Sequence, residues 1–495
     1  MKGLELGLLG LYGLCLLFVL AFSLTQWRLT WLARRVLRGG LSSPPPLPAD
    51  TQRWPRVTVQ LPVYNELNVV ERIIDAAAAL DYPAGRLQIQ VLDDSTDESV
   101  ALAAARVAWH RAQGLDIEHV RRPDRQGFKA GALAHGLEAA TGELVAIFDA
   151  DFVPAPDFLQ RTVPYFLADE GLGVVQTRWG HLNEDYSLLT ELQAFGLNAH
   201  FLVEQVGRHA GHHFINFNGT GGVWRRSCIE DAGNWQADTL TEDLDLSYRA
   251  QLRGWRFCYL PAVVAPAELP AHMDALRSQQ HRWNKGGAET ARKHLRRVWT
   301  SPHLPLSTKL HATFHLLNSA VFVAVLLMGL LSVPLLLVQT RRPELTWFFR
   351  LAGLSVLSLT PLVGYYHAAW RWNGGRGTGL RFLPKFLLFL SMSMGLSLHN
   401  AWAVLTGLAG RFTPFVRTPK SGLIRRGSGL GRWRRYRTDS VSGQTLLEAL
   451  LALYFVGGIG LAFHYDNYGL LPFHVLLAVG YGAIVYYSLR DARSA

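Results

Sequence analysis

The middle of the chain alternates short apolar runs with polar loops, whereas long unbroken apolar stretches lie toward both ends. Short runs rich in Val, Ile and Leu predict β-strands over residues 57–61, 87–92, 117–121 and 144–148. The segments between them have helical spacing or many Ala residues and predict helices over residues 68–80, 100–113 and 129–140. This alternation is typical of a mostly parallel sheet covered by helices.

Some apolar stretches are long enough to cross a membrane, and these are residues 4–24, 314–338, 346–366, 446–463 and 470–487. The first stretch has no small-residue cleavage site and is followed at once by Trp27 and Arg28. We therefore expect it to remain as a membrane anchor and not to be removed as a signal peptide.

One further apolar stretch, at residues 382–408, carries polar residues on one side of its second half. If it crossed the membrane, the basic segment 411–437 would lie opposite the basic segment 28–38, against the positive-inside rule. We therefore expect an interfacial or re-entrant segment, an outward N-terminus, an inward C-terminus and a cytosolic central domain. The basic segment fits a channel mouth and a merely solvated loop equally well.

The composition agrees with an architecture that is partly embedded and partly soluble. The 495 residues are 49% hydrophobic and 18% charged, too apolar for an ordinary soluble enzyme and too charged for a wholly embedded protein. The net charge of +11 comes from basic clusters beside the apolar stretches, so it does not favour a nucleic-acid partner. Cys15, Cys228 and Cys258 lack CxxC spacing, which indicates buried thiols in a reducing compartment.

Two of the predicted strands end in acidic residues, Asp93 with Asp94 and Asp149 with Asp151. The carboxyl ends of parallel strands share one edge of a sheet, where α/β proteins bind ligands. Several carboxylates at that edge repel one another unless a cation lies between them. A divalent metal that bridges them to a diphosphate fits this pattern, and capping of the following helix is the plainer alternative.

Two segments after the acidic pairs offer partners for a phosphate and an acceptor. Lys129 precedes a predicted helix, where its charge and backbone N–H groups suit a phosphate, although a surface Lys is the plainer interpretation. Thr241 is a predicted N-cap, which places Asp243 near the positive end of a helix dipole. Asp243 is therefore a candidate general base, whereas dipole stabilisation alone would explain Glu242 and Asp245.

An amide, a guanidinium and an indole lie close together at Gln279, Arg282 and Trp283, just before a basic run. A guanidinium binds diphosphate oxygens, and an indole can stack on the face of a sugar. Taken alone, Arg and Trp at this place would be ordinary membrane anchors. The acidic residues described above make the binding interpretation the better one.

Taken together, these motifs resemble the D, DxD, TED and QxxRW signature of the membrane-bound family 2 glycosyltransferases. The residues that match it are Asp93-Asp94, Asp149-Ala150-Asp151, Thr241-Glu242-Asp243 and Gln279-Gln280-His281-Arg282-Trp283. The resemblance covers residues 57–420. Residues 61–66, 217–220 and 238–251 look closest to the cellulose-synthase-like group, which includes glucomannan 4-β-mannosyltransferases and related glucan synthases.

The resemblance implies a GT-A fold, a Rossmann-like α/β domain with a mostly parallel sheet inserted between transmembrane helices. It implies an inverting transfer in which Asp243 is the base and a divalent metal, Mg²⁺ or Mn²⁺, binds Asp149 and Asp151. The donor would contact Tyr64, Glu66, Asp94, Lys129, Asp149 and Arg282. The acceptor would contact Phe217, Asn218, Gly219, Thr220, Glu242, Gln279 and Trp283. Phe415, Thr418 and Lys420 are similar to the FxVTxK gating loop of cellulose synthases, with Arg417 replacing its Val.

We therefore expect a transmembrane anchor at residues 1–35, a cytosolic GT-A domain at residues 55–300 and a membrane channel region at residues 306–495. The channel region would contain the interfacial helix 382–408 and the gating-type loop 411–437. The expected location is a multi-pass membrane protein in contact with membrane lipids.

The expected function is transfer of a hexose from GDP-mannose, GDP-glucose or UDP-glucose to a growing β-linked polysaccharide of mannan, glucomannan or glucan type, coupled to translocation. The alternative is a non-processive enzyme that glycosylates a lipid acceptor, similar to ceramide glucosyltransferase. A non-catalytic scaffold or transporter is a third hypothesis. It predicts loss of the acidic residues, and all of them are retained here.

Overall fold

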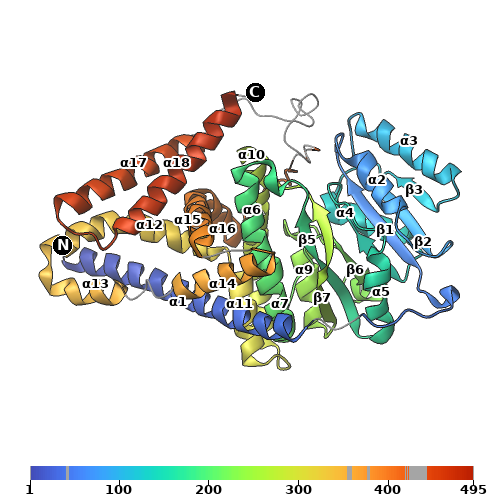
Figure 1. The fold of residues 1–495 in the computed structure, drawn as a ribbon, viewed down its shortest axis with the longest axis horizontal. Coiled ribbons are helices and arrows are strands. Elements are labelled where there is room, and N and C mark those ends of the chain that lie inside the picture. The colour runs from blue at the N-terminus through green and yellow to red at the C-terminus, as the bar shows by residue number, and fades with distance from the viewer. Residues whose placement is uncertain are drawn as a thin grey trace.

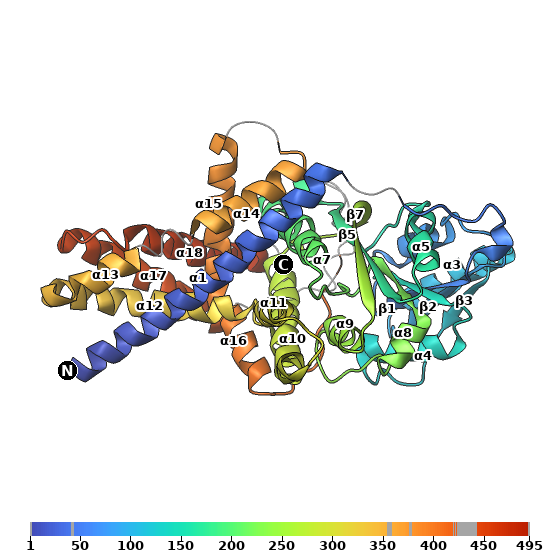
Figure 2. The ribbon, with the colours of Figure 1, turned by 90° about the horizontal axis from the view of Figure 1, so that it is seen from below.

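The computed structural model describes residues 2–40, 44–353, 359–375, 379–418, 420, 422 and 443–493. An α/β part and a bundle of long helices lie next to each other along the long axis of the molecule (Figure 1). The long helix α1 (Lys2–Gly39) runs from the N-terminus, at the far end of the bundle, toward the α/β part (Figure 2). Helix α1 therefore connects the helical bundle to the start of the α/β part.

One mixed sheet forms the centre of the α/β part, with the strand order β3-β2-β1-β4-β6-β5-β7. Its strands are β1 (Val57–Val63), β2 (Leu87–Asp93), β3 (Ile117–Val120), β4 (Leu144–Ile147), β5 (Leu172–His181), β6 (Gly222–Arg225) and β7 (Arg256–Ala267). Only the two pairings of β6, with β4 and with β5, are antiparallel. The first four strands begin at the predicted residues, and the prediction of a mostly parallel sheet is confirmed.

The predicted helices between these strands are α2 (Val70–Ala78), α3 (Ser99–Ala112) and α4 (Phe128–Ala139). Helix α2 buries Val70, Ile73, Ile74 and Ala77, the spacing of one helical face. That face packs on strands that are themselves almost fully buried, as expected for strands covered on both sides.

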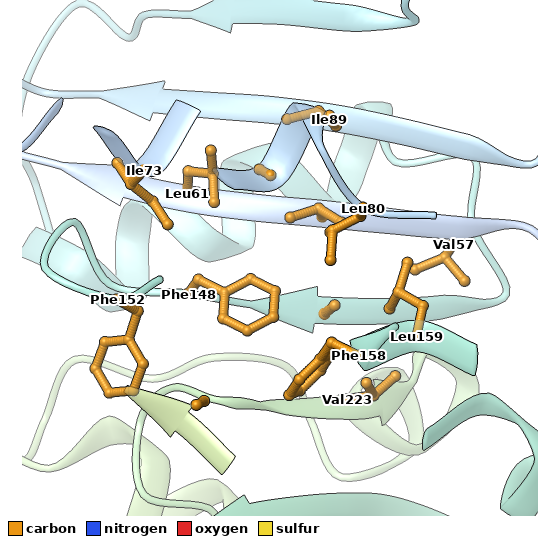
Figure 3. Packing of buried hydrophobic residues seen from close by; sticks show 14 of the residues in the cluster. Val57, Leu61, Ile73, Leu80, Ile89, Phe148, Phe152, Phe158, Leu159 and Val223 are labelled. Carbon is orange, nitrogen blue, oxygen red and sulfur yellow. The ribbon is translucent and has the colours of Figure 1, made fainter. Parts of the chain in front are cut away.

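Aromatic packing fixes the end of β4. Phe148 follows β4 and contacts Phe158 of α5 (Phe158–Ala168) edge to face, with ring centroids 4.9 Å apart (Figure 3). Both rings are almost fully buried, and burial of such a side chain stabilises a fold by roughly 1.5–3 kcal/mol. This packing therefore fixes the backbone that continues into Asp149.

Between β5 and β6 the chain forms a helical run with a π-helical centre. It consists of α6 (Leu188–Ala199), the π-helix η3 (His200–Gln205) and α7 (Val206–Ala210). Gly207 of α7 packs against α1, because a Cβ there would lie 2.5 Å from the carbonyl oxygen of Leu29. Two more helices follow β6, α8 (Arg226–Asp231) and α9 (Glu242–Leu252), and α10 (Met273–Thr300) follows β7.

Among the described residues, four helices are long and apolar enough to cross a membrane. They are Gly3–Gly39 within α1, Ala320–Arg341 (α12), Gly443–His464 (α17) and Leu471–Ala492 within α18 (Leu471–Arg493). These helices contain or overlap the stretches 4–24, 314–338, 446–463 and 470–487. The prediction of several membrane helices on both sides of the α/β domain is confirmed.

Two other apolar stretches form shorter helices. The stretch 382–408 is divided between α15 (Gly379–Gly395) and α16 (Ser397–Leu408), which are bent by 50° and form either one broken span or a re-entrant segment. The stretch 346–366 falls on α13 (Thr346–Gly353) and α14 (Leu359–Trp372), and residues 354–358 between them lie outside the described part. A span at 346–366 and an interfacial helix at 382–408 therefore stay predictions. Most of the basic segment 411–437 also lies outside the described residues.

Candidate active site

A cavity of about 180 Å³ opens where the parallel strands β1, β2 and β4 end. This is the edge at which the sequence predicts a ligand site. The predicted site residues in its wall are Tyr64, Glu66, Asp94, Lys129, Asp149, Asp151, Asn218, Gly219, Glu242, Asp243, Gln279, Arg282, Trp283, Phe415, Thr418 and Lys420. Residues from motifs more than 300 positions apart thus share one cavity.

Each carboxylate of the DxD motif faces a lysine. Lys129 Nζ lies 2.5 Å from Asp149 Oδ1, and Lys420 Nζ lies 2.7 Å from Asp151 Oδ2. Burial alone would lower the pKa of Lys129, but the charges of Asp149 and Glu242 outweigh it and raise the pKa. Both lysines therefore stay positively charged in the cavity, where a diphosphate would meet them.

The acidic side of the cavity can accept a cation. Asp151 Oδ1 and Glu66 Oε2 are buried and have no hydrogen-bond partner among the described residues. Unpaired buried carboxylate oxygens are costly, and a divalent ion satisfies them. Within the described part of the chain no three His, Cys, Asp or Glu side chains form a metal site by themselves. An ion held by the DxD motif would have ligands besides these side chains.

Glu66 is the most strongly perturbed carboxyl of this group. Burial raises its pKa to about 8, although Arg417 and Lys420 act in the opposite direction. The Arg417 guanidinium lies 3.4 Å from Glu66 Oε1. The residue that replaces the Val of the FxVTxK loop therefore contacts the cavity wall directly, through a charge that Val could not provide.

Asp243 lies in the first turn of α9 and reaches the same cavity from the other side. Burial and the neighbouring carboxyl of Glu242 raise the pKa of Asp243 to about 7. Gly219 packs directly against it, since a Cβ at this φ of +79° would lie 3.0 Å from Asp243 Oδ2. The carbonyl of Gly219 accepts a hydrogen bond of 2.9 Å from Lys129 Nζ, which connects Asp243 to the acidic side of the cavity.

At the start of α9 the predicted N-cap position is confirmed, whereas the expected role of Asp245 needs correction. Thr241 occupies the N-cap position, but its side chain makes no capping hydrogen bond within the described structure, and its hydroxyl lies 3.3 Å from the hydroxyl of Thr290. Asp245 does more than stabilise the helix dipole. It is fully buried, bonds Arg249 within α9 at 2.8 Å and lies 2.7 Å from His294 Nε2 of α10, and the second contact holds α9 against α10.

One side of the cavity is built from loops after β1, β2 and β3. Arg122 forms a bidentate pair with Asp94, with distances of 2.8 and 2.6 Å. The Arg125 guanidinium lies 3.4 Å from the ring centre of Tyr64. Asp93 is not among the described residues that line the cavity. Its carboxylate accepts a 2.8 Å hydrogen bond from the backbone N–H of Ser95, just after β2, and lies 2.8 Å from His119 Nε2 on β3.

The QxxRW helix α10 contacts the gating-type loop. Arg282 donates a 2.9 Å hydrogen bond to Thr418 and lies over the ring of Phe415, 4.8 Å from its centre. Phe415 also stacks on Phe128, with ring centroids 5.6 Å apart. The described part of the loop thus lies across the cavity and is held by residues of two different motifs.

A second cavity of about 420 Å³ continues from the first toward the long helices. Asn218, Asp243, Gln279 and Trp283 border both cavities. The wall of the second cavity includes residues of α1, α6, α14, α15 and α16. The candidate base is therefore placed at the junction between the carboxylate-lined cavity and a larger space among the candidate membrane helices.

Phe217 and Thr220 depart from the expectation that they contact an acceptor, and neither lines the described part of the cavity. Phe217 is fully buried and packs edge to face on Trp224, 5.4 Å away. The Thr220 hydroxyl accepts a 2.8 Å hydrogen bond from the backbone N–H of Asp149. These two residues hold the loop and the DxD motif in place and do not face the cavity.

The residues of the cavity wall that sequence reasoning missed include Arg125, Trp179, His181 and Glu268. Trp179 and His181 end strand β5, so the strand-end rule that identified the acidic pairs would have found them. Burial, with Arg178 nearby, lowers the pKa of His181 to about 4, so its ring is neutral near pH 7. Glu268 follows β7 in the same way and pairs with Arg72 at 2.7 Å.

The comparisons with known proteins agree on one family. Residues 55–286 match the family described as "Glycosyltransferase like family 2". Glucomannan 4-beta-mannosyltransferase 9 of Arabidopsis thaliana is 34% identical over 87% of this chain and 81% of its own length. Glucomannan 4-beta-mannosyltransferase 1 of Oryza sativa subsp. japonica is 35% identical over 76% of this chain and 72% of its own length.

One solved structure supports the GT-A fold. The mannosyltransferase PcManGT from Pyrobaculum calidifontis, in complex with GDP-Man and Mn²⁺, aligns with a TM-score of 0.51 and 20% identity. The alignment covers 82% of this chain and all of that one. The predictions of family, fold class and enzyme class are confirmed. The chain therefore belongs to family 2 of the glycosyltransferases, within its cellulose-synthase-like group, and is a hexosyltransferase.

Proposed function

We propose that this enzyme transfers mannose from GDP-mannose to a growing β-linked mannan or glucomannan by one inverting displacement. The observation that carries the proposal is that Asp243, the DxD motif and two phosphate-binding candidates, Lys129 and Arg282, line one cavity. The mannosyltransferase names of the relatives and the GDP-Man bound to the structural neighbour favour this donor over GDP-glucose and UDP-glucose.

In the proposed reaction Asp243 accepts the proton of the acceptor hydroxyl. The hydroxyl oxygen bonds to the anomeric carbon while the bond from that carbon to the diphosphate breaks, so GDP leaves with the bonding electrons. Lys129 and Arg282 stabilise the negative charge that develops on the diphosphate. A divalent ion held by Asp149 and Asp151 would supply further charge stabilisation when bound.

The second cavity offers a path for the product. It begins beside Asp243 and Trp283 and continues among residues of α1, α14, α15 and α16. A growing chain that leaves the base in this direction would pass α1, which is long and apolar enough to cross a membrane, and the bent pair α15 and α16. We therefore infer processive synthesis coupled to translocation, in preference to transfer onto a single membrane lipid.

We further propose that the catalytic domain is cytosolic. The basic residues beside the anchor and at residues 282–297 of α10 lie next to apolar helices, which the positive-inside rule places on the cytosolic side. The division into an anchor at 1–35, a GT-A domain at 55–300 and a membrane region at 306–495 belongs to the same proposal.

A donor panel tests this function. The purified full-length protein in lipid vesicles is supplied with radiolabelled GDP-mannose, GDP-glucose or UDP-glucose and with Mg²⁺ or Mn²⁺, and the product is sized. We expect a long polymer from GDP-mannose that a β-mannanase degrades. A short product extracted into organic solvent would instead indicate the glycolipid alternative, and a polymer from another donor would reassign the sugar.

The pH dependence of transfer gives a second test. Because burial and Glu242 raise the pKa of Asp243 to about 7, the base is largely protonated at pH 6 and mostly ionised at pH 8. We expect kcat/KM to rise about tenfold per pH unit below pH 7 and to level off above it. The measurement is initial rates from pH 5 to 9 at constant ionic strength. A flat profile between pH 5 and 8 would contradict a base with this pKa.

A further inference from the structure

The π-helix η3 connects the candidate membrane helices with the acceptor side of the active site. It lies between α6 and α7, where the helical bundle meets the α/β part (Figure 1). π-Helical turns are rare and occur frequently at functional sites. Two polar residues of η3, His200 and Glu204, line the second cavity.

His200 joins Glu204 to Asn218. Its Nδ1 lies 2.7 Å from Glu204 Oε2, and its Nε2 lies 3.1 Å from Asn218 Oδ1. The carboxyl of Glu204 is 5% exposed and accepts a further 2.8 Å hydrogen bond from Gln26 of α1. Burial alone would raise the pKa of Glu204, but Arg208 and His200 lower it to about 2. Glu204 is therefore an ionised, fixed acceptor that orients the His200 ring.

The other contacts of Asn218 set the direction of its amide. Its Oδ1 also accepts a 2.7 Å hydrogen bond from Asn216, and its backbone N–H donates to Gln176 at 2.9 Å. Its Nδ2 is buried without a partner among the described residues. Asn218 borders both cavities together with Asp243. Buried amide donors are almost always paired, so the hydroxyl oxygen of a sugar can accept a hydrogen bond from this amide.

We propose that His200 is a positioning residue of the acceptor site, which Glu204 orients and which holds the Asn218 amide so that its Nδ2 binds a hydroxyl of the acceptor sugar beside Asp243. This inference rests on the proposed function, since it requires a sugar acceptor in the second cavity. Through Gln26, the same chain of hydrogen bonds fixes the acceptor site relative to the first membrane helix.

Removal of this support is expected to affect acceptor binding and to spare the donor. His200→Ala should raise the KM for a tetrasaccharide acceptor about tenfold, the upper end of what one neutral hydrogen bond contributes, and leave GDP affinity within about twofold. Asn218→Ala should do the same. The double variant should be no more than about twofold worse than either single one, because both act through the same contact. His200→Gln, which keeps a side-chain donor, should recover most of the affinity.

The experiment uses the full chain in lipid vesicles, with mannotetraose and cellotetraose as acceptors and GDP binding measured separately. Binding of each tetrasaccharide to the GDP-loaded protein is also measured by calorimetric titration, so that the comparison does not depend on turnover. His135→Ala, at a partly exposed position on α4, is the matched control and should behave as the wild type.

The inference would be overturned if the double variant had a KM for the tetrasaccharide about a hundredfold above that of the wild type, because the two substitutions would then act independently. Equal losses of GDP and tetrasaccharide affinity would also overturn it, because they indicate general disruption of the domain. Failure of the proposed function would give a different result in the same experiment. In that case the wild type itself binds neither tetrasaccharide, and a buried Asn218 amide donor then serves no acceptor sugar.

Discussion

Replacement of Asp243 by Asn is expected to lower kcat for sugar transfer by at least about 10³-fold, within the range that general base catalysis contributes. Asn has nearly the same shape and can still accept the backbone hydrogen bond from Leu244, which is 2.8 Å long in the native enzyme. It cannot take the acceptor proton. GDP affinity should stay within about twofold of the wild type, because Asp243 faces the acceptor side of the junction between the cavities.

Two controls accompany this variant. Asp116→Asn changes an exposed aspartate far from the cavity and should leave kcat unchanged. At pH 8 the thermal unfolding temperature of Asp243→Asn should be no lower than that of the wild type. The raised pKa of Asp243 means that its protonated form favours the folded state, and this contribution is lost as pH rises through about 7. A variant that keeps more than about a tenth of the activity would remove Asp243 from the role of base.

Replacement of Asp151 by Ala is expected to weaken Mn²⁺-dependent binding of GDP-mannose by about 100-fold or more, since even indirect support of a metal ligand contributes 10–100-fold. Asp151 supplies a buried oxygen without a partner among the described residues, and its other oxygen pairs with Lys420. The measurement is calorimetric titration of GDP-mannose with saturating Mn²⁺ and again with EDTA. The difference between the two affinities should nearly vanish in the variant.

Loss of the Lys420 contact could contribute to this result, so two variants separate the effects. Lys420→Ala removes the same ion pair but leaves both carboxylates of the DxD motif, and it should retain most of the Mn²⁺ dependence. Asp157→Ala, at an exposed position just before α5, is the matched acidic control. An unchanged Mn²⁺ requirement in Asp151→Ala would show that Asp151 is not a metal ligand.

The parts of the fold with strong periodicity were predictable from the sequence. The strands that begin at Val57, Leu87, Ile117 and Leu144 are short, apolar and separated by helical patterns, and all four form in parallel register. Their shared direction also explains why acidic residues far apart in the chain lie in one cavity. The arrangement of the apolar helices could not be predicted in the same way. The 50° bend between α15 and α16 depends on packing against other helices, which hydropathy does not encode.

The motifs that form the site could be predicted from the sequence, but the position of each residue within a motif could be predicted less well. Within residues 217–220, Asn218 and Gly219 line the cavity while Phe217 packs into the core and Thr220 bonds the backbone of Asp149. Adjacent residues of an irregular loop point in directions that no simple period describes, so the sequence could not separate them. His200 was equally hidden, because a π-turn has no clear sequence pattern and places its side chains differently from an α-helix.

Apart from the residues that they share, the two cavities take their walls from different segments of the chain. The wall of the first cavity includes loops that follow strands, with Tyr64 and Arg125 among its residues, whereas Tyr366 and Phe389 in the second cavity come from α14 and α15. Directed evolution toward a new sugar and toward a new product length can therefore use separate residue libraries. Trp283 borders both spaces, and an engineer who changes it would alter both properties at once.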